Sequence, residues 1–378
     1  MSGLDVRVIR PLDVVHLRGN RLFEGTGDGV AVMPPWPSLF AGALRTRMLA
    51  DADALDRYAT SGLDGEMAKA LGRRYGERHQ GEFRVAFACL AKEGEPLVPL
   101  PADVSVFDEH TTNGEAGGRR IVRLAPEPIP EGLCTSGPGL PCWPVLRERA
   151  KPERGPWYLR PAGVARWQRG ETPDPTDLVH ARELWKDDPR IGIARDRSTA
   201  TVLEGMLYTS RAITLVPGVS FLVGVRGGHG CVPSSGLLRL GGDGRAATIA
   251  PFDAAIDDPP WERVPSRDRF TLWLVSPGAF EGGWRLPGCQ NGRTWCVGTL
   301  KAEIVAASVA RYEVVSGWDV ARNRPKPATR VVPAGAVYWL ERKEGDLGEL
   351  RRVLEHGLGA VDRDREIEGF GAAWLGEW

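Results

Sequence analysis

Residues 195–199 place two arginines beside an aspartate and two hydroxyl side chains, in the order Arg-Asp-Arg-Ser-Thr. The flanking stretches, 190–193 and 202–208, carry apolar residues that suit strands, so the segment predicts a β-hairpin with a polar tip. Because a guanidinium fork binds phosphate oxygens bidentately, such a tip could grip a nucleic-acid backbone. An ordinary hairpin with a solvated tip is the other interpretation. The residues that we predict to bind RNA in this segment are Arg190, Arg195, Arg197, Thr199 and Thr201.

Two glycine clusters are further candidates for binding an anion. Residues 241–245 read Gly-Gly-Asp-Gly-Arg, and residues 368–371 read Glu-Gly-Phe-Gly. Glycine lets backbone N–H groups approach an anion without a clashing side chain, whereas a helix cap followed by a β-bulge is the structural alternative. The first cluster resembles the Gly-Gly-Asp-Asp of polymerase palms but lacks the second carboxylate that two-metal chemistry needs. The predicted contacts are Gly241, Gly242, Gly244, Arg245, Gly369, Phe370 and Gly371.

A helix is predicted from Ser38 to about residue 50, because Phe40, Leu44 and Met48 recur at helical spacing after a proline-rich stretch. Ser38 is the expected N-cap. The free N–H groups at the start of this helix, with arginines on the helix and in the preceding loop, predict an anion site. A plain amphipathic helix with surface arginines is the alternative. The predicted contacts here are Arg18, Arg21, Ser38 and Arg45.

Arginines alternate with aromatic residues in two stretches, 147–169 and 318–326. Rings on which bases stack, set among cations that bind phosphate, are what single-stranded nucleic acid requires. For the longer stretch, a solvated insertion whose tryptophans fold back on the body fits equally well. In the shorter stretch the predicted RNA contacts are Arg322, Arg324 and Lys326.

Sets of catalytic residues are sparse. The six histidines form no metal-spaced pair and no His-Glu-x-x-His motif, and the phosphate-binding loop of nucleotide hydrolases is absent. His16 and His229 are candidate general bases of a metal-free ribonuclease, although a hydrogen-bonded structural histidine is the preferred interpretation. The six cysteines include no C-x-x-C pair, so reduced thiols in a cytoplasmic protein are expected. We expect no cofactor, no metal and no enzymatic activity.

The bulk composition is that of a soluble globular protein without a strong overall charge. The chain has 378 residues, 42% of them hydrophobic, and its 49 basic and 49 acidic residues give a formal net charge of +0. Any contact with nucleic acid must therefore come from local patches. No apolar run is long enough to span a membrane, so no membrane partner is expected.

The order of the predicted elements is β-α-β-β-α-β in each half of the chain, which predicts an α+β fold of two ferredoxin-like domains. We place the N-terminal domain at residues 1–255 and the C-terminal domain at 265–378. The stretch 96–189 is too long for a connection and is interpreted as an insertion, with the hairpin at 190–210 after it. A short helix is expected at 235–240, and strands are expected at 294–307, 331–340 and 366–374.

Several short blocks along nearly the whole chain carry a family resemblance. They are Pro-Trp-Pro-Ser at 35–38, Gly-Ala-Leu-Arg at 42–45, and the segments 190–193, 204–208, 240–245, 276–278, 317–319, 333–338 and 368–371. In their order and spread the chain resembles the RAMP-superfamily subunit of the type III-B CRISPR Cmr effector complex that binds the 5′ tag of the guide RNA. The resemblance implies two ferredoxin-like (RRM-like) domains with a protruding hairpin, called the thumb.

The same resemblance implies a non-catalytic role. Such a subunit caps the complex, holds the repeat-derived 5′ tag of the CRISPR guide RNA, and docks the large polymerase-like subunit and a backbone RAMP subunit, meeting target RNA only indirectly. Residues 190–208 are then the candidate thumb, and the helix start and glycine clusters are candidate tag contacts. A RAMP endoribonuclease that processes guide precursors, and a protein scaffold without RNA contacts, are the alternatives.

Overall fold

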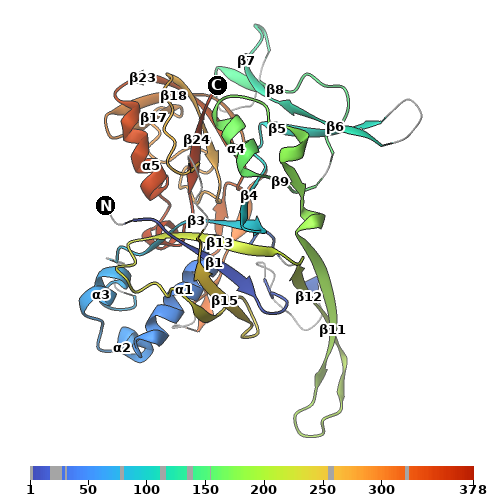
Figure 1. Cartoon of the computed structure of the whole chain (residues 1–378), viewed down its shortest axis with the longest axis vertical. Coiled ribbons are helices and arrows are strands. Elements are labelled where there is room, and N and C mark those ends of the chain that lie inside the picture. Colours follow the sequence, from blue (N-terminus) through green and yellow to red (C-terminus); the bar gives the residue numbers. More distant parts are fainter. Residues whose placement is uncertain are drawn as a thin grey trace. The chain divides into compact units, whose positions relative to one another are not determined.

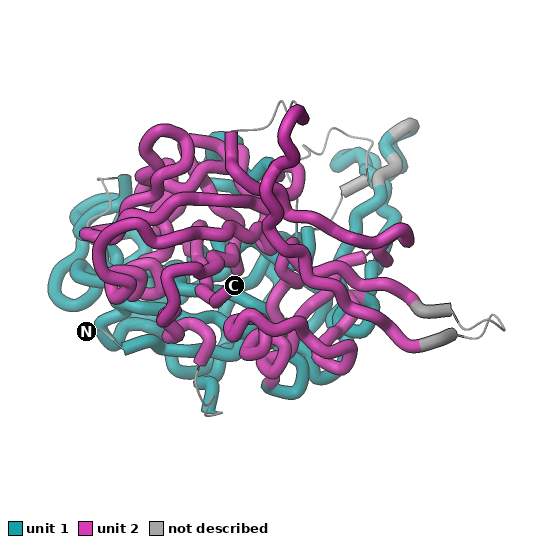
Figure 2. Tube along the Cα trace, turned by 90° about the horizontal axis from the view of Figure 1, so that it is seen from above, with its two compact units in different colours: residues 1–94, 182–253, 314–329 teal, residues 95–181, 254–313, 330–378 magenta. Residues whose placement is uncertain are grey.

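The computed structural model describes residues 3–17, 28–29, 32–76, 81–110, 116–133, 139–153, 155–253, 259–319 and 323–378. It is a mixed α/β structure, rich in strands and with few helices (Figure 1). The chain divides into two compact units, each built from separate stretches of sequence (Figure 2). Unit 1 contains residues 1–94, 182–253 and 314–329, and unit 2 contains residues 95–181, 254–313 and 330–378.

Unit 1 is built on an antiparallel sheet with the strand order β3-β13-β1-β15-β14. Its elements are β1 (Asp5–Pro11), β2 (Asp28–Gly29), α1 (Pro37–Asp51), α2 (Leu55–Ala59), α3 (Gly65–Leu71), β3 (Arg84–Lys92), β11 (Trp185–Arg195), β12 (Val202–Leu215), β13 (Val219–Arg226), β14 (Gly236–Arg239), β15 (Ala246–Pro251), β20 (Trp318–Asp319) and β21 (Arg324–Pro325).

Helix α1 packs its apolar stripe on this sheet. Phe40, Leu44 and Met48 are buried, and the rings of Phe40 and Phe221 lie 5.2 Å apart between their centroids. The predicted helix is confirmed, but its N-cap is Trp36 and not Ser38. Pro37 occupies the first helical position, where its fixed φ suits the helix and its missing N–H removes no bond. Ser38 therefore lies within the first turn.

Unit 2 is built on a sheet with the order β17-β18-β23-β16-β24, and a smaller antiparallel sheet, β10-β9-β4, belongs to the same unit. Its elements are β4 (Glu95–Pro99), β5 (Val104–His110), β6 (Ala116–Arg123), β7 (Ala125–Pro128), β8 (Cys142–Val145), β9 (Trp157–Leu159), α4 (Pro161–Gln168), η1 (Pro175–Asp177), β10 (Leu178–His180), β16 (Arg269–Leu274), β17 (Thr294–Val297), β18 (Leu300–Ser308), β23 (Val337–Glu344), η3 (Leu347–Leu350), α5 (Arg351–His356), α6 (Arg363–Ile367) and β24 (Ala373–Glu377). At the limits of the two units lie η2 (Ala181–Glu183), β19 (Glu313–Val315) and β22 (Thr329–Val331).

Each sheet lacks one of the two helices that the sequence pattern led us to expect. Residues 227–245, all of them described, contain no helix, and the helix expected at 235–240 is wrong. Gly236 has a φ of +114°, which a helix does not accept, and β14 pairs with β15 so that Leu238 is buried and Leu237 exposed. In the second sheet, residues 275–293 join β16 to β17 without a helix.

Three strand predictions in the C-terminal part are corrected. The strand expected at 294–307 is a hairpin, β17 and β18, which turns at Gly298 with a φ of +55°. The strand expected at 331–340 is interrupted after β22 by Pro333 and resumes as β23. The strand expected at 366–374 begins only at Ala373, because Asp362 accepts a bond from the N–H of Arg365 at 2.8 Å and starts α6.

A buried polar network explains why residues 95–181, which contain most of the stretch 96–189 interpreted from the sequence as an insertion in the first domain, group with the C-terminal strands. Asp103 is fully buried and accepts bonds from Trp167 Nε1 at 2.9 Å and from Arg123 Nε at 2.8 Å. Trp167 packs against Trp273 of β16, and Gln168 Nε2 donates to the carbonyl of Leu375 in β24 at 2.9 Å. The segment is thus tied to the main sheet of unit 2.

Replacing Asp103 with Ala should destabilise unit 2 by about 3–5 kcal/mol, because Arg123 and Trp167 Nε1 would stay buried without their acceptor. Urea unfolding followed by tryptophan fluorescence measures the loss. Asp364→Ala, at an exposed position of α6, is the matched control and should change stability by less than about 0.5 kcal/mol. Equal stability of the two variants would contradict the role given to Asp103.

No helix among the described residues is long and apolar enough to cross a membrane.

Candidate functional site

The first glycine cluster folds as a tight turn against the segment that follows β1. Gly242 N–H donates to the carbonyl oxygen of His16 at 2.9 Å, and Leu240 N–H donates to the carbonyl of Arg245 at 2.9 Å. Gly241 has a φ of +78°, and a Cβ at this position would lie 2.6 Å from the His16 oxygen. Glycine is therefore required here by a close backbone approach. We expected these N–H groups to be available to an anion. For Gly242 this is wrong, because its N–H donates to His16 inside the unit.

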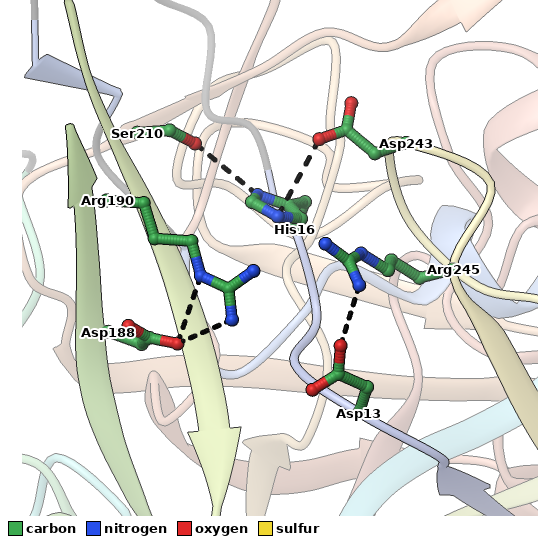
Figure 3. A network of polar contacts seen from close by, with 7 residues as sticks. All are labelled: Asp13, His16, Asp188, Arg190, Ser210, Asp243 and Arg245. Carbon is green, nitrogen blue, oxygen red and sulfur yellow. Dashed lines mark hydrogen bonds and ion pairs between the residues drawn. The ribbon is translucent and has the colours of Figure 1, made fainter. Parts of the chain in front are cut away.

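The side chain of His16 joins three segments that are distant in sequence. Its Nδ1 lies 3.4 Å from Ser210 Oγ of β12, and its Nε2 lies 3.6 Å from Asp243 Oδ2 in the glycine turn (Figure 3). His16 is only 6% exposed. A general base must reach the proton that it removes, and both ring nitrogens of His16 instead face neighbours of the same unit. These contacts agree with the interpretation of His16 as a hydrogen-bonded structural histidine.

His229 is held in a similar way, with Nε2 at 2.8 Å from Glu82 and Nδ1 at 3.5 Å from Glu66. Within the described part of the chain, no group of three or more histidine, cysteine, aspartate or glutamate residues could hold a metal ion.

Two arginines lie beside His16, and each is paired with an aspartate. Arg245 contacts Asp13 at 2.6 Å, and Arg190 of β11 contacts Asp188 at 2.9 Å. The hydrogen bond that Arg190 donates to Asp188 raises the pKa of Arg190, and the negative charge of the nearby Asp13 adds to this. Figure 3 shows both guanidinium groups directed toward the segment that carries Asp13 and His16. The aspartates thereby fix the direction of two permanent cations.

The side chain of Arg245 has one buried N–H group without an acceptor in the described structure. Its Nε is buried and has no hydrogen-bond partner within the described residues. We call the surface formed by His16, the turn 240–245, Arg190 and Ser210 the hairpin-root site.

Strands β11 and β12 form a long antiparallel hairpin, which Figure 1 shows leading away from the sheet of unit 1. The ladder runs from Trp185↔Leu215 to Arg195↔Val202, and β2 pairs with β12 midway along that strand, at Thr209 and Ser210. Most of the hairpin is exposed, and Ile191 has 74% of its surface open to solvent. The apolar residues of the outer part of the hairpin are therefore exposed, whereas Ile213 near its base belongs to a small core with Val15 and Leu17.

The tip of the hairpin is closed by one carboxylate. Asp196 accepts bonds from Ser198 N at 2.8 Å, Thr199 N at 2.9 Å and Ser198 Oγ at 2.5 Å. Its own N–H donates to the carbonyl of Thr201 at 2.9 Å. These bonds to the charged form lower the pKa of Asp196 to about 2, with the Ser198 hydroxyl as the largest cause.

The predicted contacts at the tip are not equivalent. Arg195 Nε donates to the carbonyl of Ala200 at 3.0 Å, and the Thr199 and Thr201 hydroxyls bond each other at 2.7 Å. These three side chains therefore support the turn itself. Arg197 is exposed within the same turn, and of the two tip arginines it is the one without such a role in the described structure.

The other predicted contacts are separate from the hairpin-root site. The Arg45 guanidinium lies over the ring of Phe83, 5.9 Å from its centroid. Arg324 lies in the short strand β21, and Lys326 N–H donates to the carbonyl of Gly317 at 2.8 Å. Three predicted residues, Arg18, Arg21 and Arg322, lie outside the described residues.

The second glycine cluster is buried in unit 2. Phe370 is a core residue with the Arg365 guanidinium over its ring, and Arg365 also forms a buried ion pair with Glu368 at 2.9 Å. The carbonyl of Gly369 accepts from Ser276 Oγ, and Gly371 N–H donates to the carbonyl of Pro277. The structural alternative fits here, because these groups already have partners inside the unit.

With this geometry in place, comparison with known protein families assigns the chain. The model of a family of CRISPR-associated proteins, Cas_Cmr3, matches residues 7–378. The chain belongs to the Cmr3 family. This confirms the predicted kinship with a RAMP-type subunit of the Cmr effector complex.

Solved structures show only a distant likeness. A chain in the cryo-EM structure of the type III-B Cmr-beta bound to cognate target RNA has a TM-score of 0.45 and 15% identity, with 88% of this chain and 86% of that chain covered. The crystal structure of a Csm3-Csm4 subcomplex of the type III-A interference complex gives a TM-score of 0.37 and 8% identity, over 90% and 93% of the two chains. Among curated proteins no match is found.

Some residues of the candidate site in this Cmr3-family chain are not predicted by any sequence motif. Asp13, Asp188 and Ser210 position the arginines and the histidine of the hairpin-root site, but they are single polar residues in or beside strands and form no motif. Asp243 could have been found, because an aspartate among glycines favours the left-handed turn that it adopts, with a φ of +58°.

Replacing Gly241 with Ala should disrupt the hairpin-root site of this Cmr3-family chain. The positive φ alone costs about 1–3 kcal/mol for a residue with a side chain, and the clash with the His16 carbonyl adds to it. The free energy of unfolding in urea is the measurement. Gly244→Ala is the control, since Gly244 also has a positive φ but no atom within 4 Å of an added Cβ. A loss at Gly241 no larger than at Gly244 would refute the close approach.

The low pKa of Asp196 predicts how the hairpin tip depends on pH. The folded pKa is depressed, so the carboxylate stabilises the tip fully above its ordinary pKa of 3.8 and loses this effect as the pH falls through about 2. The amide NMR signals of Ser198 and Thr199 should therefore stay unchanged from about pH 7 to about pH 3. An Asp196→Ala variant supplies the reference shifts of an open turn. A midpoint near the ordinary value would show that the carboxylate does not close the turn.

Proposed function

We propose that this chain is the non-catalytic subunit of a type III-B CRISPR effector complex that holds the repeat-derived 5′ tag of the guide RNA. One observation carries the proposal. In a member of the Cmr3 family, two oriented arginines, a glycine turn and the root of an exposed hairpin meet at one place on unit 1. A single-stranded backbone that follows this surface would meet Arg245 and Arg190 in turn.

The chemistry of the hairpin-root site favours binding over cleavage. The guanidinium N–H groups of Arg190 and Arg245 that do not donate to Asp188 and Asp13 can donate to phosphate oxygens. His16, the candidate base for cleavage, is enclosed by Ser210 and Asp243. The endoribonuclease alternative is therefore not favoured.

We assign the β11–β12 hairpin as the thumb that lies against the guide where the tag ends and the spacer begins. Three features support this assignment: the hairpin is long and exposed, its root adjoins the arginine pair, and its tip presents Arg197 on a closed turn. In such a complex the chain would dock the large polymerase-like subunit and a backbone RAMP subunit, and would meet target RNA only indirectly. We also infer that it works in the cytoplasm.

Two ferredoxin-like domains are the proposed architecture for this task. The strand order of the two sheets supports this. When the four main strands of each unit are numbered along the chain, their order across the sheet is fourth-first-third-second, and neighbouring strands are antiparallel. In unit 1 these strands are β1, β3, β13 and β15, and in unit 2 they are β16, β18, β23 and β24. Helix α1 packs on the sheet of unit 1, and the helical segment from η3 to α6 lies between β23 and β24 in unit 2.

Replacing Arg197 with Gln should weaken retention of guide RNA by the assembled complex, with the largest difference from the unaltered chain at low salt. Removing one phosphate contact with a single strand makes the slope of log affinity against log salt shallower by about 0.7. Filter binding across a salt series measures this slope. Arg197 is a cleaner choice than Arg195, whose Nε holds the carbonyl of Ala200. Arg57→Gln, at an exposed position of α2, is the charge-matched control and should leave the slope unchanged.

A photoreactive group in the 5′ tag tests the proposal as a whole. The tag should crosslink to this chain within residues 13–17, 190–211 or 240–245. Crosslinks found only on other subunits would overturn the proposal.

A further inference from the structure

Tyr312 is an exposed aromatic residue that lies apart from the hairpin-root site. It belongs to unit 2, directly precedes β19, and has 48% of its surface open to solvent. Arg330 lies in β22, the strand that pairs with β19. Its guanidinium carbon is 4.9 Å from the centroid of the Tyr312 ring, and that of Arg311 is 5.9 Å away. Two guanidinium groups therefore lie near the one aromatic ring of Tyr312.

These two arginines differ from most other arginines of unit 2. Arg120 is bound by Glu148 at 2.5 Å, Arg147 by Glu127 at 2.6 Å, and Arg342 by Asp268 at 2.6 Å. Neither Arg311 nor Arg330 has a carboxylate within ion-pair distance among the residues that the structure describes, and both are exposed. A chain with no net charge thus has here a small cluster of uncompensated positive charge.

The ring does not neutralise the cluster. A cation over an aromatic face at an exposed site gains only about 0.5–1 kcal/mol, and two like charges at one ring repel each other. An anion between the guanidinium groups would relieve this repulsion. The exposed part of the ring adds a flat surface, on which a second planar group can stack. An anion joined to a planar group describes a nucleotide of a single strand.

We propose that Tyr312, Arg311 and Arg330 form a second single-stranded RNA contact, in which one unpaired base stacks on the ring and the adjoining phosphate is bound by the two guanidinium groups. The inference rests on the proposed function only in that RNA is the partner, since all three residues belong to unit 2 and the hairpin-root site belongs to unit 1. An acidic peptide would use the arginines but would gain little from an aromatic ring.

The ring is tested by comparing Tyr312→Leu with Tyr312→Phe in the assembled complex. Leucine keeps an apolar side chain and removes the stacking surface, whereas phenylalanine keeps it. Binding of radiolabelled guide RNA, and then of radiolabelled target RNA to the guide-loaded complex, should weaken at least fivefold for Tyr312→Leu in one of these two measurements and stay within twofold for Tyr312→Phe. Unchanged binding of both RNAs by Tyr312→Leu would overturn the proposal, as would equal losses in the two variants.

The charge and the source of the RNA are tested separately. The Arg311→Gln, Arg330→Gln double variant should lower the salt slope of the same RNA, with Arg351→Gln on α5 as the exposed control. A benzoylphenylalanine placed at position 312 should crosslink to labelled guide RNA if the guide is the source, and to labelled target RNA if the target is. Crosslinks to protein alone, or none to RNA, would overturn the proposal.

The outcome is separable from that of the hairpin-root site. A loss of tag retention in Arg197→Gln with normal RNA binding in Tyr312→Leu supports the proposed function and overturns the second contact. The reverse pattern overturns the proposed function at the thumb and supports the contact at Tyr312.

Discussion

The carbonyl oxygen of His16 can be approached only by a residue without a side chain, and the hairpin-root site depends on this constraint. Gly241 has no Cβ to block the approach, so that Gly242 can donate its N–H to this oxygen. The turn then carries Asp243 to one side of the imidazole, while β12 brings Ser210 to the other. With the imidazole fixed, the segment that holds Asp13 is fixed as well, and Asp13 positions Arg245. The steric requirement at Gly241 is thus linked, through a series of short contacts, to the direction of the Arg245 guanidinium group.

Unit 2 depends on a constraint of a different kind, a buried charge. Asp103 is enclosed with Arg123 and Trp167, and breaking one partner of such a group costs far more than the pair contributes when intact. A network of this kind specifies one arrangement of the segments that it joins. Here it joins the stretch 95–181 to the C-terminal strands, although the whole of β11 to β15 lies between them in the sequence.

Local patterns in the sequence predicted the elements whose cause is local. The period of Phe40, Leu44 and Met48 placed α1, and the polar run 195–199 placed the turn between β11 and β12. Where an element depends on tertiary contacts, the local sequence pattern did not predict it. The Leu-Leu pair at 237–238 suits a helix or a strand equally, and only pairing with β15 decides it. The same holds for the site, since Asp13 and Asp188 acquire their roles only from the arginines that the fold brings to them.

The way in which the β11–β12 hairpin is held together determines how its length can change. Its tip is closed by hydrogen bonds among its own residues, and on the tip side of Thr209 its two strands pair only with each other in the described structure. Residues can therefore be inserted or removed two at a time in both strands without disturbing a core, and the side chains keep their faces. Each such step moves the tip by about 7 Å, close to the length of one extended nucleotide. The length of the hairpin can therefore change in steps of about one nucleotide.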